Sequence, residues 1–348
     1  MREKGADLAR PTVHDIAKEA GVSLATVDRV LNARPGVRAK TIARVNDAVS
    51  RLGYVRDTYA ANLARQRQYR FAFLLPESSS QFANALQEAL QEAYSSNVAD
   101  RTELKVIRVP SQDPHAIVRT LKSMNTSRLD GLAMMVPETP QVRDAVSRLK
   151  DSGLAVVTLV SDLPNSRRDF FVGVNSIAAG RTAGLLMGRF VRGPGEILVV
   201  TDSLQSRDSL ERRLGFDAVI SREFRSITAL PTLESYGDLA RLQRIVETAV
   251  AARRDLVGVY SMGSGNMTLM SALRGSGRLG ELDVLVHELT PAMRCALQDN
   301  EVTAVIAQNV GHLVRSALRV LRNVCDHRPI YEAQERVRIE VVLRENLP

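Results

Sequence analysis

The chain has 348 residues, of which 45% are hydrophobic and 25% are charged, and its formal net charge is +8. A chain of this length and apolar content can form a buried core in more than one domain. This excludes the class of intrinsically disordered proteins. The first residues, MREKGADLAR, are charged, and no apolar run of about 18 residues occurs in the chain. We therefore expect no secretion signal, no membrane partner and a cytoplasmic location.

Residues 12–32 predict a short helix that leads into a tight turn. The first helix has one apolar face with helical spacing, made by Val13, Ile16, Ala17 and Ala20. Thr12 suits the N-cap, and Asp15, three residues later, approximates the acidic half of a capping box. Gly21 is expected to end this helix, because glycine adopts a left-handed turn without steric penalty.

A second helix begins after Ser23, and a third follows it. In the second helix Val27, Val30 and Leu31 share the buried face, which leaves outward-facing side chains on Leu24, Ala25, Asp28, Arg29 and Asn32. The third helix is predicted from apolar residues at helical spacing, with Gly53 after them: Ile42, Val45, Val49 and Leu52. Three short helices with the second one exposed form an architecture that docks in a major groove.

The positive charge is concentrated in this helical head. Residues 1–70 hold 14 Lys and Arg against 7 Asp and Glu, so +7 of the total +8 lies there. A polyanion is therefore the expected partner of the head and not of the body.

The head resembles the DNA-binding head of the lactose-repressor (LacI/GalR) family of bacterial transcription factors. The resemblance rests on residues 12–32, on Lys40-Thr41 and on Leu52-Gly53-Tyr54. It implies a homodimer with a helix-turn-helix domain at 1–55, a hinge helix or linker at 56–68 and a two-lobed effector-binding domain at 69–348. Residues that the resemblance and the exposed face assign to DNA are Thr12, Val13, Ser23, Leu24, Ala25, Thr26, Asp28, Arg29, Asn32, Arg38, Thr41, Tyr54, Ala60 and Leu63.

The side chains on the second helix suggest how it reads DNA. Leu24 and Ala25 are short and apolar, which favours contact with thymine methyl groups. Arg29 is able to read guanine, to hold a phosphate or to support the fold. Asp28 stands where the family usually has serine, and a carboxylate repels phosphate, so it either faces a cytosine amino group or pairs with a nearby basic residue.

Residues 57–65, DTYAANLAR, predict a marginal hinge helix. Asp57 or Thr58 can cap it, but a helix this short forms in water only when a partner stabilises it. In the family, paired hinge helices insert a leucine into the minor groove, and Leu63 matches that position. The alternative is that Leu63 packs against the body. Arg56 departs from the family, which often has proline there.

From residue 70 onward, strands and helices alternate in two successive series. The predicted strands are 71–76, 104–109, 131–136, 154–160 and 170–174, then, after a helix at 177–191, 196–201, 227–231, 256–260, 282–287 and 302–307. This alternation is typical of α/β folds with doubly wound parallel sheets. The fold expected is an all-α head followed by two lobes similar to periplasmic sugar-binding proteins, lobe 1 at about 69–174 and 309–332 and lobe 2 at about 175–308 and 333–348.

A cleft between the lobes should bind a small ligand at the carboxyl ends of the strands. Phe82, just past the first strand, is able to stack on a sugar ring, or else makes a core contact at a helix N-terminus. Asp162, after the fourth strand, is able to accept hydrogen bonds from hydroxyl groups, or else is an ordinary loop aspartate beside Pro164.

The family resemblance adds further effector candidates. Asn175 and Arg181 lie in a segment similar to the one that crosses between lobes and brings an arginine to the effector; for Arg181 a surface salt bridge is the alternative. Met262 stands where the family commonly has a polar residue, so Ser261 is expected to serve instead. Glu288 and Gln308 match a carboxylate and a glutamine position of the family.

Enzyme and metal motifs are not found. Gly263-Ser264-Gly265 begins like a GxGxxG loop, but Thr268 stands where its last glycine belongs. The five histidines have no metal-ligand spacing, and no GxSxG or GxxxxGK motif occurs. We expect no catalytic residue, no metal and no cofactor. Cys295 and Cys325 are expected to be buried free thiols.

These patterns predict a homodimeric repressor that binds a pseudo-palindromic operator in double-stranded DNA. A small-molecule effector in the cleft, a carbohydrate or related polyol, would change its affinity for DNA. Two other classes of protein are the alternatives. A solute-binding protein needs only the body, and the basic head argues against it; a sugar-modifying enzyme with a DNA-binding head lacks any enzyme motif.

Overall fold

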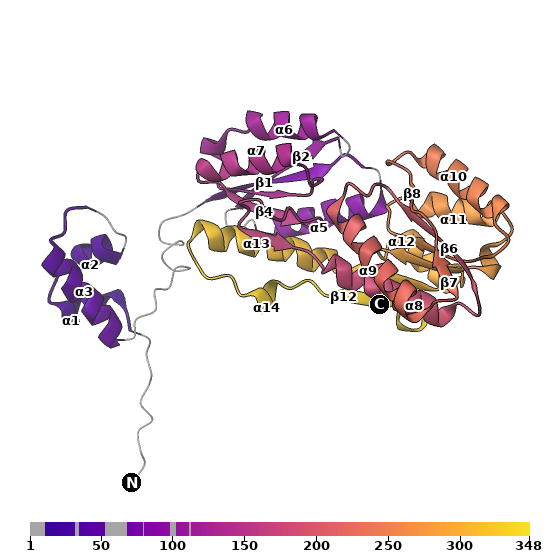
Figure 1. The fold of residues 1–348 in the computed structure, drawn as a ribbon. Helices are drawn as coiled ribbons and strands as arrows, with labels where there is room; N and C mark the ends of the chain where they lie inside the picture. The colour runs from indigo at the N-terminus through magenta and orange to yellow at the C-terminus, as the bar shows by residue number, and fades with distance from the viewer. Residues whose placement is uncertain (1–10, 32–34, 53–67, 79, 98–101, 111–112) are drawn as a thin grey trace, which may run out of the picture. The chain divides into compact units, whose positions relative to one another are not determined.

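A computed structural model describes residues 11–31, 35–52, 68–78, 80–97, 102–110 and 113–348. The chain divides into two compact units, Met1–Arg67 and Gln68–Pro348, and each is described by itself (Figure 1). Within the described ranges, no helix combines the length and the apolar character needed to cross a membrane.

The first unit contains the three predicted helices, α1 (Val13–Ala20), α2 (Leu24–Leu31) and α3 (Ala39–Leu52). The predicted capping box is confirmed: the Asp15 backbone N–H donates to the Thr12 hydroxyl, and the Asp15 carboxylate accepts from the Thr12 N–H at 2.8 Å. Gly21 ends α1 with a φ of 59°. A small core joins the helices and consists of Ile16, Ala17, Ala20, Val27, Val45 and Ala48.

Two features of the head are not predicted by the spacing of its apolar residues. Ile42 is 38% exposed and lies outside the head core, because Val45, Ala48 and Leu52 form the face of α3 that packs inward. In addition, the Arg44 guanidinium donates to the Ala20 and Gly21 carbonyl oxygens, so α3 satisfies the last carbonyls of α1. No sequence pattern signals that contact.

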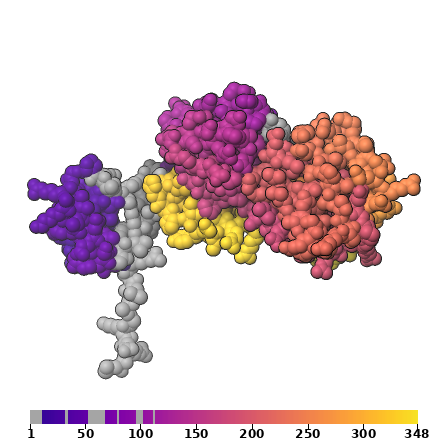
Figure 2. Space-filling view, viewed as in Figure 1, coloured from indigo at the N-terminus to yellow at the C-terminus, as the bar shows by residue number. Residues whose placement is uncertain are grey.

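Lobe 1 of the second unit is built on a five-stranded parallel sheet in the order β2-β1-β3-β4-β5. The strands are β1 (Tyr69–Pro76), β2 (Thr102–Val109), β3 (Gly131–Met134), β4 (Ala155–Leu159) and β5 (Phe170–Val172). One face is covered by α5 (Gln81–Asn97) and α13 (Val310–Cys325), the other by α6 (Pro114–Ser123) and α7 (Pro140–Asp151) (Figure 1). The short turn η2 (Thr126–Arg128) precedes β3. Figure 2 shows the late, yellow residues against this lobe.

Lobe 2 is built on a seven-stranded sheet in the order β12-β11-β10-β9-β6-β7, with β8 also paired to β6. The strands are β6 (Gly195–Thr201), β7 (Ile227–Ala229), β8 (Leu233–Glu234), β9 (Leu256–Ser261), β10 (Asp283–His287), β11 (Ala304–Gln308) and β12 (Ile339–Val342). Its helices are α8 (Ser176–Phe190) and α9 (Arg207–Glu223) on one face, and α10 (Leu239–Ala252), α11 (Asn266–Gly275) and α12 (Pro291–Gln298) on the other. Three short elements remain. η3 (Leu279–Glu281) precedes β10, α14 (Glu332–Glu335) lies between α13 and β12, and η4 (Arg344–Asn346) follows β12.

All ten predicted strands are present, which confirms the α/β fold with two parallel-sheet lobes. Two strands were missed: β8 has two residues, and β12 pairs antiparallel with β11 at the sheet edge. Both depend on a distant partner strand and not on a local apolar run. The chain crosses between the lobes three times, after β5, after β11 and after α14.

Helices α8 and α9 approach each other closely enough for their backbones to touch. A methyl group at Gly180 would lie 1.9 Å from the Arg212 carbonyl oxygen, and one at Gly215 would lie 2.2 Å from the Ile177 carbonyl oxygen. Glycine is therefore required at both positions for steric reasons. This contact fixes the part of α9 that carries Arg212.

Candidate functional site

The exposed face of α2 is the candidate DNA-reading surface of the first unit. Leu24 is 42% exposed, and Ala25, Asp28 and Arg29 are exposed beside it. The Ser23 hydroxyl accepts from the Thr26 N–H at 3.2 Å, so these two residues also start the helix. Of the remaining candidates, Thr12, Val13 and Arg38 are exposed, Thr41 is half-buried, and Asn32, Tyr54, Ala60 and Leu63 lie outside the described residues.

The second unit contains a cavity of about 590 Å³ between its lobes. Its walls include residues that directly follow strands of both sheets, among them Met135 after β3, Asp202 after β6 and Glu288 after β10. The strand order reverses between β1 and β3 in one sheet and between β6 and β9 in the other. Ligands bind at such reversal points, beyond the carboxyl ends of the strands, so both sheets direct a ligand to this cavity.

Two residues in the cavity wall have a left-handed backbone. Val160, after β4, has a φ of 61°, and Glu288, after β10, has a φ of 72°. This conformation is costly for side chains other than glycine, and most costly for a β-branched one such as Val160. Strain of this kind persists where the surrounding fold imposes it and is concentrated at functional sites, which agrees with the position of the cavity.

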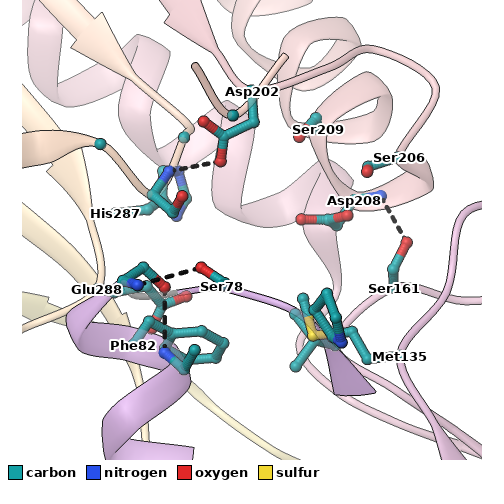
Figure 3. Close-up of a pocket in the computed structure, with 18 of the residues that line it drawn as sticks. Ser78, Phe82, Met135, Ser161, Asp202, Ser206, Asp208, Ser209, His287 and Glu288 are labelled. Carbon is teal, nitrogen blue, oxygen red and sulfur yellow. Dashed lines mark hydrogen bonds between the residues drawn. The ribbon is translucent and has the colours of Figure 1, made fainter. Parts of the chain in front are cut away.

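Arg212 is the charged centre of the cavity. It is 3% exposed, its Nη1 lies 3.5 Å from the Asp208 carboxylate, and its Nη2 lies 3.7 Å from that of Glu288 (Figure 3 shows both carboxylates). Both distances exceed those of a charge-assisted hydrogen bond. The guanidinium also donates to the Met262 carbonyl oxygen at 3.4 Å, and its buried Nε has no hydrogen-bond partner among the residues that the structure describes.

Hydrogen bonds among buried polar residues hold the side chains of the cavity wall in place. The Gln308 amide donates to Glu288 at 2.8 Å, and the Ser261 hydroxyl donates to Asn266, whose own amide donates to the His287 carbonyl oxygen. Burial lowers the pKa of His287 well below its usual value, so its imidazole is neutral. In the part of the chain that the structure describes, no group of three or more acidic, histidine or cysteine side chains is placed to hold a metal ion.

Lobe 1 contributes mainly apolar and hydroxyl groups to the cavity, including Phe82, Met135 and Ser161 (Figure 3). The two lobes also contact each other directly around it. The Asp208 N–H donates to the Ser161 hydroxyl at 3.5 Å, and the Ala292 N–H donates to the Gln81 side chain at 3.2 Å. An ion pair of 3.3 Å joins Arg207 of lobe 2 to Glu138 of lobe 1.

The structure places the predicted effector residues in three groups. Phe82, Met262 and Glu288 line the cavity, and Ser261 and Gln308 lie behind its wall. The remaining three do not line the cavity: Asp162 pairs with Arg168, Asn175 caps α8, and Arg181 is exposed on α8. Cys295 was also expected to be buried but is exposed, since Met293, Ala296 and Leu297 form the inner side of α12.

The arginines that line the cavity are Arg212 on α9 and Arg108 on β2, and not Arg181 on α8. Sequence reasoning missed Arg212 together with Asp208 and Asp202. The available signal was the position of the aspartates: Asp202 directly follows the predicted strand 196–201, and Asp208 begins the helix after it. Arg212 is one helical turn after Asp208, so the two side chains share a face.

A pH-dependent change in stability is expected from Glu288. Burial raises the pKa of its carboxyl group from 4.5 to about 7, so the folded state retains a proton that the unfolded chain releases. The stabilising contribution of the protonated form is complete below pH 4.5 and is lost as the pH rises through 7. We expect the free energy of unfolding of Glu288→Gln, relative to the unsubstituted protein, to increase by about 3 kcal/mol between those pH values.

Urea unfolding at pH 5 and at pH 8 measures this difference. Glu92→Gln, at an exposed site on α5, is the matched control and should stay within about 0.5 kcal/mol of the unsubstituted protein at both values. A Glu288→Gln difference that is the same at the two pH values would contradict the assignment.

Two protein families match this chain over separate parts. Residues 12–57 match the model of bacterial regulatory proteins of the lacI family, and residues 71–329 match the periplasmic binding protein domain. Among curated proteins, catabolite control protein A of Priestia megaterium is 29% identical over 43% of this chain, and that of Streptococcus mutans is 25% identical over 53%. The matched stretches span 43% and 55% of the lengths of those relatives.

Solved structures resemble the second unit in fold. A glucose-galactose binding protein from Geobacillus stearothermophilus has a TM-score of 0.72 at 18% identity, covering 81% of this chain and 99% of that protein. A solute-binding protein from Burkholderia graminis in complex with D-arabinose has a TM-score of 0.71 at 23% identity, covering 80% and 96%. A lacI-type transcriptional regulator from Bacteroides fragilis has a TM-score of 0.70 at 18% identity, covering 80% and 98%. The chain therefore belongs to the lacI family of bacterial regulatory proteins, with the family's DNA-binding domain ahead of a periplasmic binding protein domain.

Proposed function

We propose that this protein is a transcriptional repressor that binds a pseudo-palindromic operator as a homodimer and that a small effector in the cavity controls its affinity for DNA. The observation that carries the proposal is the presence, in one chain, of an exposed second helix on a basic head and a cavity centred on a buried arginine. A head (1–55), a hinge (56–68) and an effector domain (69–348) are the parts it requires. A protein acting on bacterial chromosomal DNA works in the cytoplasm.

The exposed side chains of α2 support a particular way of reading DNA. Leu24 and Ala25 would contact thymine methyl groups, and Arg29 would donate to a guanine or a phosphate. Contacts to phosphates set the position of the head without reading sequence. An operator for this protein is therefore expected to contain thymines opposite the start of α2.

A carbohydrate or related polyol is the proposed class of effector. The cavity wall combines carboxylates, serine hydroxyls, an asparagine and a guanidinium, which match the alternating donors and acceptors of a polyol, with Phe82 as an apolar face. Two proteins of the same fold are a glucose-galactose binding protein and a solute-binding protein in complex with D-arabinose.

Closure of the lobes is the proposed route from effector to DNA. The contacts of Ser161 with Asp208, of Gln81 with Ala292 and of Glu138 with Arg207 would form and break as the lobes rotate. A hinge helix at 57–65, with Leu63 as its minor-groove residue, would report that rotation to the heads; it lies outside the described residues. A coupling free energy of about 1–3 kcal/mol is sufficient.

Salt-dependent DNA binding tests this function. We expect the full-length protein to bind duplexes that it selects from random DNA, with an affinity that falls steeply and linearly in a plot of log K against log salt. Arg29→Ala should weaken binding about 10- to 100-fold. Arg225→Ala, at an exposed site on lobe 2, is the matched control and should leave binding unchanged. Fluorescence anisotropy measures both, and a protein with no salt-dependent DNA binding would instead be a solute-binding protein.

A further inference from the structure

The cavity wall contains more carboxylates than cationic groups. Four acidic residues line it, Glu77, Asp202, Asp208 and Glu288, against two arginines, Arg108 and Arg212. His287 also lines it, but burial lowers its pKa well below the usual value, so it adds no positive charge. Because burial also raises the pKa of Glu288 to about 7, the wall with Glu288 protonated has a net charge of −1, from three carboxylates and two arginines.

Both arginines are already included in this net charge. Arg212 is shared between Asp208 and Glu288, at 3.5 and 3.7 Å. Arg108 is half-buried and donates to the Pro76 carbonyl oxygen at 3.1 Å and to the Gln87 side chain, so both of its Nη atoms are engaged within lobe 1.

Asp202 lacks a cationic partner among the described residues. Its carboxylate accepts from the Ser264 N–H at 2.8 Å and from the Ser235 hydroxyl at 3.1 Å, and both donors are neutral. Figure 3 shows the carboxyl groups of Asp202, Asp208 and Glu288 around one open space, with the Phe82 ring on its lobe 1 side. Asp202 is half-buried, and an opposite charge in hydrogen-bond contact would stabilise its carboxylate.

We propose that the effector carries a positive charge, as a polyhydroxylated amine in its ammonium form, for which an amino sugar is the simplest example. The ammonium group has three donors and no acceptor, which fits a wall where Asp202, Asp208 and Glu288 offer acceptors. A ligand hydroxyl oxygen accepts from the Arg212 guanidinium, which lines the cavity. The Phe82 ring contacts the sugar face and attracts the cation.

The same charges disfavour the alternative ligand classes. A sugar acid or a sugar phosphate would bring a further negative charge next to Asp202, Asp208 and Glu288, and Arg212 is already shared by two of them. A neutral sugar leaves Asp202 without a cation. This inference rests on the proposed function only in taking the cavity as the effector site.

A panel of matched ligands tests the charge of the effector. Isothermal titration calorimetry on the full-length protein, at a pH where the amines are protonated, compares D-glucosamine, D-galactosamine and D-mannosamine with their neutral parents, their N-acetyl derivatives and the corresponding uronic acids. We expect at least one amine to bind about tenfold or more tightly than its neutral parent and its N-acetyl derivative, and the acids to bind most weakly. A panel in which no amine exceeds its neutral parent, including one in which nothing binds, overturns the proposal.

A second variant shows whether the preference comes from this wall. Asp202→Asn should reduce the ratio of amine to neutral affinity about tenfold. Asp299→Asn, at an exposed site after α12, is the matched control and should leave the ratio unchanged. An unchanged ratio in Asp202→Asn overturns the assignment to this wall. The two proposals fail in different ways. If the protein preferred the amine but showed no salt-dependent DNA binding, the regulator function would be wrong and the charge of the effector would stand.

Discussion

Replacing Gly180 with alanine is expected to destabilise the effector domain by about 3 kcal/mol or more. The added methyl group would lie 1.9 Å from the Arg212 carbonyl oxygen, and backbone on the neighbouring helix cannot move aside as a flexible side chain can. Helices α8 and α9 would have to separate, which disturbs the core they share above the lobe 2 sheet. Urea unfolding of the full-length protein, followed by circular dichroism, measures the change.

Two other glycines provide the comparison. At Gly184 the nearest atom would lie 2.9 Å away, so Gly184→Ala should destabilise the domain less than Gly180→Ala. At Gly275 nothing lies within 4 Å, so Gly275→Ala should change stability by less than about 1 kcal/mol. Equal losses at Gly180 and Gly275 would show that the close approach of α8 and α9 does not exist.

Arg212→Met should have the second large effect, on both stability and ligand response. Removal of the guanidinium leaves the Asp208 and Glu288 carboxylates without a buried cation, which typically costs about 3–5 kcal/mol. A ligand hydrogen-bonded to Arg212 should bind at least about 30-fold more weakly. Thermal unfolding at pH 8 and calorimetry with the tightest-binding sugar from the panel measure the two effects.

Arg181→Met is the matched control for Arg212→Met. Arg181 is exposed on α8 and does not line the cavity, so the substitution should change stability by less than about 0.5 kcal/mol and leave ligand affinity unaltered. If Arg181→Met reduced ligand affinity as much as Arg212→Met, α8 and not α9 would supply the arginine of the site.

Most of the fold could be predicted from local pattern. The capping box of Thr12 and Asp15, the left-handed Gly21 and the burial of Ile16, Ala17 and Ala20 act over a few residues and are confirmed, whereas Val13, predicted on the same face, is 38% exposed. The ten predicted strands are apolar runs buried between helices, and burial on both faces makes such runs visible in any sequence. Strand β12 could not be found in this way, because it exists through its pairing with β11.

The cavity could be predicted only in part. Residues directly after strands, such as Met262 and Glu288, follow from the rule that ligands bind beyond the carboxyl ends of parallel strands. Asp162 also follows a strand, but it pairs with Arg168 and faces away, and strand position alone does not report the direction of a side chain. For the same reason the sequence could not show whether Arg181 or Arg212 points into the cavity, since each lies on a helix of lobe 2.

The sequence by itself determined the helical head, its basic charge, the exposed face of α2 and the two series of parallel strands, because capping, periodicity and composition act over short distances along the chain. Only the tertiary structure decided which charged residues meet. Arg212 enters the cavity because glycines at 180 and 215 let α9 lie directly against α8, and Glu288 and Asp208 reach it from different elements of lobe 2. Such a meeting depends on the packing of segments up to about 80 residues apart in the chain, and no local pattern encodes it.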